Sequence, residues 1–467
     1  MKVTQVAIRP TEASNAAMRP ALTPELLAAS GARYSRNNEG LGAILAKIDP
    51  RNLDRSVDSI FKMIDYGHQS IADMAPVAMF IDGISIWLAY FIWSVCPTAG
   101  GQESSTRYIK LSVDELIPAD ILGIAAVDQS EWRDAMALAF DAYTGALSAW
   151  ESIFDANPAV ARIPSTLLAD TSDKAQRQVA RMRRNYGFDR ARYFLPVACS
   201  TNMMMVMSAR GWVQLCQLLL SHLLPEARCC GDAIREELGL AVPRLLRHAT
   251  EKESMRSGQM KQFEQVRGLA AARRGTQTAA GDSAAAANAF LDVTLPADVA
   301  AAELTADLTD HDNRYAWMGD SLRRTTVRFG WEAVALAEIR DLNRHRTGWK
   351  YCPLNPVGFY CAADAAPSQI SSGGVARLAS VGGAASATAA ALLRDGRPEY
   401  IYWTLLGTQY RFEHTTAADK FLYEAELRTG VGAHFRYAQH LHDVLSLWYE
   451  QFPDTRGLVL EGSAEPE

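Results

Sequence analysis

The triplet Arg344-His345-Arg346 decides how this chain is interpreted, and it follows residues 331–343, which are predicted to be a helix. Two guanidiniums that flank an imidazole can bind anions, because arginine presents a planar fork of donors to phosphate oxygens. Taken alone, such a triplet is more typical of a solvated helix end than of a binding site. Its meaning therefore depends on residues that lie far upstream.

The upstream residues are a Gly67-His68 pair, a long apolar segment, and the loop Gln102-Glu103-Ser104-Ser105-Thr106-Arg107-Tyr108. Together with the triplet they resemble the signature of the flavin-dependent (alternative) thymidylate synthases. In that family R-H-R is followed after a short interval by S-x-R, and a G-H pair precedes both. Here the signature is divided between two halves of one chain.

Size and composition limit the class of protein. A chain of 467 residues is too long for one typical domain and suits two domains or a duplication. A net charge of −6 argues against a general binder of nucleic acid or of membrane surfaces. Seven cysteines without C-x-x-C spacing fit a reducing compartment. We therefore expect a cytoplasmic protein with a small-molecule substrate and with neither nucleic acid nor membrane as a partner.

Residues 76–96 are apolar enough to be compared with a membrane span. Polar and small residues around Asp82 interrupt this segment and leave it too short to cross a bilayer comfortably. We predict a strand at 77–81 followed by a buried helix at 84–95.

Apolar spacing and composition predict the other elements. Helices are expected at 20–65, 129–153 and 203–246, and a further helical region is expected to open at 400–408. Stretches rich in alanine, glycine and serine are predicted to be a linker or exposed helix at 267–288 and a mobile insertion at 362–391.

The predicted fold class is α+β, built as two tandem repeats that each pair a helical bundle with a small antiparallel sheet. The first repeat is expected at 1–250 and keeps G-H and S-x-R. A linker is expected at 251–290, the second repeat at 291–455 with R-H-R, and a solvated acidic tail at 456–467.

Each predicted repeat retains different positions of the family signature. In the first repeat, R-H-R would fall at Trp93-Ser94-Val95 and is lost, while the second repeat lacks S-x-R. The arginine before the family's L-P dipeptide is matched by Arg192 and replaced at Ile401. A later arginine is matched by Arg428 and replaced by leucines at 218–220. These complementary losses favour one composite site made from both repeats.

The resemblance implies FAD as cofactor, with NADPH and methylene-tetrahydrofolate as co-substrates, because the flavin carries the redox chemistry in such enzymes. It implies catalytic roles for Ser105, Arg107 and Arg344. The implied cofactor ligands are His68, Glu103, Arg344, His345 and Arg346. The implied substrate ligands are Ser105, Arg107, Arg192, Asp341 and Arg428. No metal site is expected, since His434, His440 and His442 have no cysteine or carboxylate at matching spacing.

Asp341 departs from the family, which has a polar amide three positions before R-H-R. A carboxylate there would repel an electron-rich pyrimidine edge and could accept hydrogen bonds from a donor-rich substrate. Three functions therefore stay open. They are reductive methylation of a uridylate-like pyrimidine, flavin chemistry on a modified pyrimidine or a peptide, and a non-catalytic paralogue. The resemblance also implies a homodimer that imitates the family's homotetramer.

Overall fold

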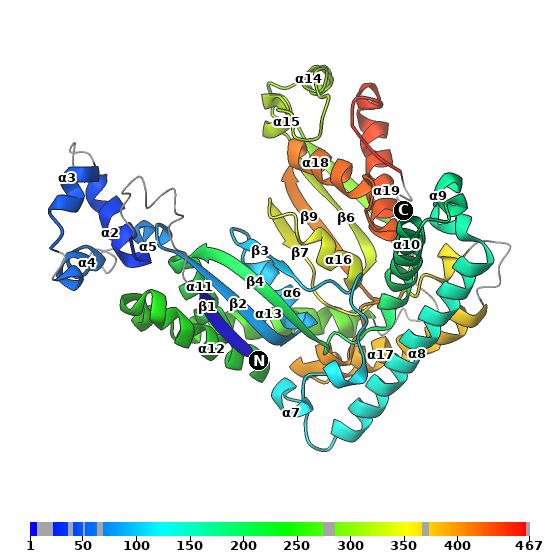
Figure 1. The fold of residues 1–467 in the computed structure, drawn as a ribbon, viewed down its shortest axis with the longest axis horizontal. Helices are drawn as coiled ribbons and strands as arrows, with labels where there is room; N and C mark the ends of the chain where they lie inside the picture. Colours follow the sequence, from blue (N-terminus) through cyan, green and yellow to red (C-terminus); the bar gives the residue numbers. More distant parts are fainter. Residues whose placement is uncertain are drawn as a thin grey trace. The chain divides into compact units, whose positions relative to one another are not determined.

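The computed structural model describes residues 1–6, 22–35, 41–49, 52–62, 69–273, 285–366 and 373–463 (Figure 1). The chain divides into two compact units that alternate along the sequence. Unit 1 comprises Met1–Ser104, Leu116–Ala125 and Cys199–Phe263, and unit 2 comprises Ser105–Glu115, Ala126–Ala198 and Glu264–Glu467. These units do not follow the predicted boundaries at 250 and 291, because a helical segment from the first half of the sequence packs in unit 2.

Unit 1 is built on an antiparallel sheet with the strand order β1-β2-β4-β3. Its strands are β1 (Lys2–Val6), β2 (Pro76–Ser85), β3 (Gly100–Glu103) and β4 (Ser200–Ser208). Its helices are α2 (Pro24–Tyr34), α3 (Leu41–Ala46), α4 (Leu53–Phe61), α5 (Ser70–Asp73), α6 (Ile86–Val95), α7 (Ala119–Leu122), α11 (Ala209–Leu220) and α12 (Pro225–Ala241).

The predicted strand followed by a buried helix is confirmed as β2 and α6. The Ser85 hydroxyl caps α6 by accepting from the Leu88 amide at 3.0 Å, and the buried Glu226 carboxylate accepts from the Ser85 amide at 2.6 Å. No helix in the described part of the chain is long and apolar enough to cross a membrane.

Unit 2 contains a second antiparallel sheet with the order β5-β6-β9-β7, in which β8 also pairs with β9. Its strands are β5 (Ala289–Thr294), β6 (Thr326–Ala335), β7 (Trp349–Tyr351), β8 (Gly358–Phe359) and β9 (Thr408–Ala417). Its helices are α8 (Gln129–Ala156), α9 (Ser165–Ala169), α10 (Asp173–Ala191), α14 (Ala301–Asp307), α15 (Asp320–Arg324), α16 (Leu336–Leu342), α17 (Gly373–Arg394), α18 (Ala418–Thr429) and α19 (Phe435–Gln451).

The two sheets have the same connectivity. In each, the second strand leads directly into a helix, α6 or α16, and the strand beside it leads into two further helices, α11 and α12 or α18 and α19. Each second strand also shifts register near its end, between Asp82 and Ile84 in β2 and between Trp331 and Val334 in β6.

Three segments predicted to be α-helical have a different structure. Residues 203–208 belong to β4, where Met203, Met205 and Met207 are buried while the residues between them are more exposed. This alternation has the period of two that is typical of a strand. The segment 331–343 is the end of β6 followed by the short helix α16. The segment 400–408 is a 3-10 turn, η7 (Pro398–Trp403), that precedes β9.

Two segments predicted from composition contain helices. The helix α13 (Glu253–Arg273) occupies the first half of the 251–290 linker and agrees with the exposed-helix alternative for 267–273, and residues 274–284 lie outside the described residues. The insertion 362–391 contains α17, which packs against α8 and η7 and buries Ala389 and Leu393. Alanine has the highest helix propensity, so an alanine-rich stretch needs only one apolar face to become an ordered helix.

The predicted solvated tail is also held to unit 2 over its described part. Val459 is buried, the Leu460 amide donates to Glu426 at 2.9 Å, and the Gly462 amide donates to the Thr429 hydroxyl at 2.8 Å. Residues 464–467 lie outside the described residues.

Candidate functional site

The R-H-R triplet lies in a turn directly after α16. The amide of Arg344 donates to the carbonyl of Asp341 at 3.3 Å, and that of His345 donates to the carbonyl of Leu342 at 3.2 Å. Gly348 then adopts φ +65°, and a Cβ added there would stand 2.0 Å from the carbonyl oxygen of Thr415. A glycine is therefore required where the chain turns from the triplet into β7.

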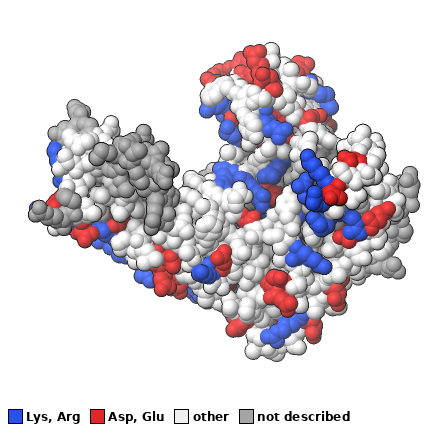
Figure 2. Space-filling model, in the orientation of Figure 1, with Lys and Arg blue, Asp and Glu red and all other residues white. Residues whose placement is uncertain are grey.

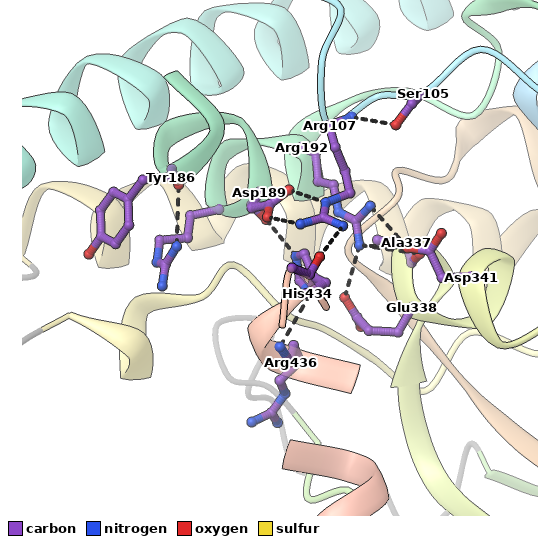
Figure 3. A network of polar contacts seen from close by, with 12 residues as sticks. Ser105, Arg107, Tyr186, Asp189, Arg192, Ala337, Glu338, Asp341, His434 and Arg436 are labelled. Carbon is purple, nitrogen blue, oxygen red and sulfur yellow. Dashed lines mark hydrogen bonds and ion pairs between the residues drawn. The ribbon is translucent and has the colours of Figure 1, made fainter. Parts of the chain in front are cut away.

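Three arginines that are far apart from one another in the sequence converge on Asp341. Both terminal nitrogens of Arg192, at the start of the 3-10 turn η4 (Arg192–Phe194), lie 3.3 Å from the Asp341 carboxylate. The Arg344 Nε lies 3.7 Å from it, and Arg428 on α18 donates to the Asp341 carbonyl at 2.9 Å. Burial would raise the pKa of Asp341, but the arginines, Arg192 foremost, lower it to about 2. Asp341 is therefore an ionised, buried centre of a cationic cluster, and Figure 3 shows its contact with Arg192.

Arg107 is held by a second acid, Asp189 at the end of α10. Its Nε and one terminal nitrogen each donate to a carboxylate oxygen of Asp189 at 2.7 Å, in the forked geometry that binds planar anions most tightly (Figure 3). The Ser105 hydroxyl accepts from the Arg107 amide at 3.2 Å, which fixes the loop. Burial opposes the charge of Arg107, yet Asp189 raises its pKa above the ordinary value.

His345 is neutral. The Arg428 Nε donates to its Nε2 at 2.7 Å, so that nitrogen is an acceptor and cannot also carry a proton. Burial lowers the pKa of His345 to about 4, and the charge of Arg428 acts in the same direction. The triplet thus offers two cations, Arg344 and Arg346, around an uncharged imidazole.

A pocket of about 620 Å³ opens beside the triplet, within the usual range for small-molecule sites. Figure 2 shows basic side chains gathered over the region in which β7, β9 and α18 lie in Figure 1. The pocket is lined by Arg314, Tyr315, Ala316, Trp317, Met318, Arg323, Arg344, His345, Arg346, Thr347, Asp419, Lys420, Tyr423, Leu427 and Arg428. The lining contains five arginines and Lys420 but one carboxylate, Asp419, which lies 3.1 Å from Lys420. Positive charge therefore dominates.

The pocket also offers flat apolar surface. Trp317 is 72% exposed although it lines a pocket, and the guanidinium of Arg323 lies 4.1 Å from its ring centre. Tyr315 and Tyr423 pair at 6.2 Å on the same wall. Aromatic faces next to arginines suit a ligand that combines a planar ring with anionic groups.

Most of the predicted site residues come together in unit 2. Ser105, Arg107, Arg192, Asp341 and Arg428 form the buried cluster or adjoin it, and the triplet joins that cluster to the pocket. Glu103 belongs to β3 of unit 1 and His68 lies outside the described residues, so both assignments stay predictions. Among the described side chains, no group of histidines, cysteines and acids could hold a metal ion.

One family model matches the first half of the sequence. The model of the thymidylate synthase complementing protein family, which comprises the flavin-dependent thymidylate synthases, matches residues 20–244. This segment belongs to that family. A search of curated proteins found no match to the chain.

The match to the thymidylate synthase complementing protein family ends before the second half of the signature. It covers Gly67-His68, Ser105, Arg107 and Arg192, whereas Arg344-His345-Arg346 and Arg428 lie beyond residue 244. The matched segment is therefore thymidylate synthase-like, and hydrogen bonds within unit 2 connect its Arg192 with Asp341 of the unmatched part.

Sequence reasoning missed the acids and the aromatic wall. Asp189 and Glu338 are single carboxylates in ordinary helical segments, so nothing in the sequence distinguishes them. Trp317-Met318 had a usable signal, because it precedes β6 by the same number of residues by which Gly67-His68 precedes β2. The exposed pocket aromatics could thus have been found by aligning the second half of the sequence with the family's G-H pair.

Glu338 gives the site a testable pH signature. This fully buried carboxyl accepts from the Tyr193 hydroxyl at 2.7 Å and lies 3.9 Å from Arg192. Burial raises the pKa of Glu338 to about 7. The folded protein therefore holds a proton that the unfolded chain releases above about pH 4.3, and this group makes stability fall as pH rises from that value to about 7.

We expect Glu338→Gln to remove this fall in the free energy of unfolding, which amounts to about 3 kcal/mol between pH 5 and pH 8. Urea unfolding of parent and variant at the two pH values measures it. Glu413→Gln is the matched control, because hydrogen bonds and charge from Arg328 and Arg411 lower the pKa of Glu413 against the effect of burial. Glu413 is ionised at both pH values, so its replacement should cost the same at each. An equal pH dependence in parent and Glu338→Gln would contradict the assignment.

Proposed function

We propose that this protein is an FAD-dependent enzyme of the thymidylate synthase type with a composite site drawn from two fused copies of one ancestral subunit. The observation that carries the proposal is the convergence of Arg192, from the family-matched segment, with Arg344 and Arg428 on Asp341. Each of these arginines matches a family position that the other half of the chain has lost.

The duplication is supported by the shared connectivity of the two sheets and by a reciprocal contact between equivalent segments. The Val197 amide donates to the Thr404 carbonyl at 3.1 Å, and the Leu406 amide donates to the Leu195 carbonyl at 2.8 Å. Between these bonds, Pro196 and Leu405 form an antiparallel bridge. Self-complementary pairing of this kind is what a twofold contact between two copies of one segment produces.

The residues around the pocket fit FAD. Its pyrophosphate needs several fixed cations, and Arg344, Arg346 and Arg428 provide them beside an uncharged His345. Its flat rings need an aromatic surface, which Trp317 and the tyrosine pair supply. When bound, the flavin would supply hydride transfer. The protein's own residues would bind and orient it and exclude water from the buried cluster.

The reaction that the family favours is reductive methylation of a uridylate-like pyrimidine, with NADPH and methylene-tetrahydrofolate as co-substrates. In that reaction the guanidiniums of Arg107 and Arg192 would stabilise negative charge that develops on a ring oxygen. A second candidate is flavin chemistry on a different substrate, such as a modified pyrimidine or a peptide. The ion pairs of these two arginines with Asp189 and Asp341 favour this second candidate. By the same analogy, a homodimer would correspond to the family's homotetramer.

FAD binding tests the proposal directly. We expect purified protein to release FAD on heating, or to bind added FAD with a Kd in the micromolar range or below, as measured by the change in flavin fluorescence. Protein that carries no flavin and leaves the fluorescence of added FAD unchanged would instead indicate the non-catalytic paralogue.

A further inference from the structure

The two arginines that the family resemblance assigns to the substrate each contact an acid of their own chain. Arg107 forms a two-point ion pair with Asp189, with both nitrogen–oxygen distances at 2.7 Å. Arg192 contacts Asp341 through two nitrogens at 3.3 Å and donates a third bond to the carbonyl of Ala337 at 3.4 Å. In Figure 3 both guanidiniums point at these partners.

These ion pairs are parts of a buried, connected structure. Asp189, Arg192 and Asp341 are buried, and the side chain of Arg107 is only 17% exposed. The imidazole of His434 lies 3.0 Å from the Asp189 carbonyl and ties the end of α10 to the loop before α19. A carboxylate held by the fork of an arginine occupies the donors that a phosphate would use.

Arg344, which lines the pocket, is not held in a close ion pair of this kind. Arg344 is 43% exposed in its side chain, and its nearest approach to Asp341 is 3.7 Å, which is too long for a hydrogen bond. The pocket lining adds Arg314 and Arg323 to the positive charge, while Lys420 is paired with Asp419 at 3.1 Å. Capacity for a ligand's anionic groups is therefore concentrated on the pocket side, while the buried cluster is neutralised from within.

We propose that Asp189 and Asp341 stand in for a substrate phosphate, so that the substrate accepted next to Arg107 and Arg192 carries no phosphate group. This inference rests on the proposed function and specifies its substrate class as an uncharged, nucleoside-like or other ring compound. A phosphate entering the cluster would have to displace a buried carboxylate from its arginine. It would also lie beside an ionised acid of like charge.

The test compares uridine with uridine 5′-monophosphate by isothermal titration calorimetry, with and without FAD. The parent should bind the two compounds within about threefold of each other, or bind neither. Asp189→Asn and Asp341→Asn should each raise the affinity for the monophosphate relative to that for uridine by at least about tenfold, because a neutral amide leaves the guanidinium open to phosphate. Asp155→Asn, which removes the exposed partner of Arg183, is the matched control and should change neither affinity.

The two variants change different ion pairs, so each can be tested even if the other fails to fold. Asp341→Asn leaves Glu338 beside Arg192, and Asp189→Asn affects an arginine that is partly exposed. Two results would overturn the proposal. One is a parent that binds the monophosphate at least about 30-fold more tightly than uridine, and the other is folded variants that gain no monophosphate affinity relative to that for uridine. Absence of FAD binding would defeat the proposed function alone, since the calorimetric comparison does not need flavin.

Discussion

Replacement of Arg192 by methionine should lower the free energy of unfolding by about 3–5 kcal/mol. The substitution leaves the ionised carboxylate of Asp341 buried without its main counter-ion and removes the cation nearest to Glu338. Urea denaturation with an unchanged m-value measures the effect. The cost arises from stranding a charge, not from lost packing, since methionine retains much of the apolar volume.

A double-mutant cycle separates these causes. Arg192→Met combined with Asp341→Asn should be clearly more stable than Arg192→Met alone, because the stranded charge is gone. Arg183→Met, which breaks exposed pairs with Asp155 and Glu151, should cost about 1 kcal/mol or less. A loss below 1 kcal/mol for Arg192→Met would show that Asp341 does not depend on this arginine.

The second large effect concerns the pocket. Combined replacement of Arg344 and Arg346 by glutamine should weaken FAD binding roughly 100- to 10,000-fold, because each charge-assisted hydrogen bond contributes about 1.5–3 kcal/mol. Fluorescence titration with FAD gives the affinities, and a thermal melt checks that the variant is folded. Arg183→Gln serves as the control for loss of positive charge outside the pocket. If the double variant binds FAD within about threefold of the parent, the flavin does not use this pocket.

The sequence predicted local structure well where one pattern had a single interpretation. The strand and helix at β2 and α6 followed from an apolar segment that polar residues interrupt, and α8 followed from long helical spacing. The later part of β4, residues 203–208, and the end of β6 were wrongly predicted to be helical. Short apolar runs have no period that distinguishes a buried strand from a buried helix, and their strand partners are far away in the sequence.

The candidate site, like the fold, was predicted only in part from the sequence. The residue types and order of Ser105, Arg107 and Arg192 indicated the family that matches residues 20–244. The composite arrangement with Arg344-His345-Arg346 and Arg428, which lie beyond that match, stays a proposal. The aromatic wall at Trp317 was not predicted, since an exposed tryptophan has no local meaning until its place beside the arginines is known.

The sequence by itself identified which arginines are candidates for anion binding and that they are divided between its two halves. Only the tertiary structure decided which of those cations are already neutralised. Asp341 and Arg192 are 149 positions apart, and Asp189 and Arg107 are 82 apart. Ion pairs between such distant residues leave no spacing signal, because they form only when the folded backbone brings the two side chains within a few ångströms and removes water from between them.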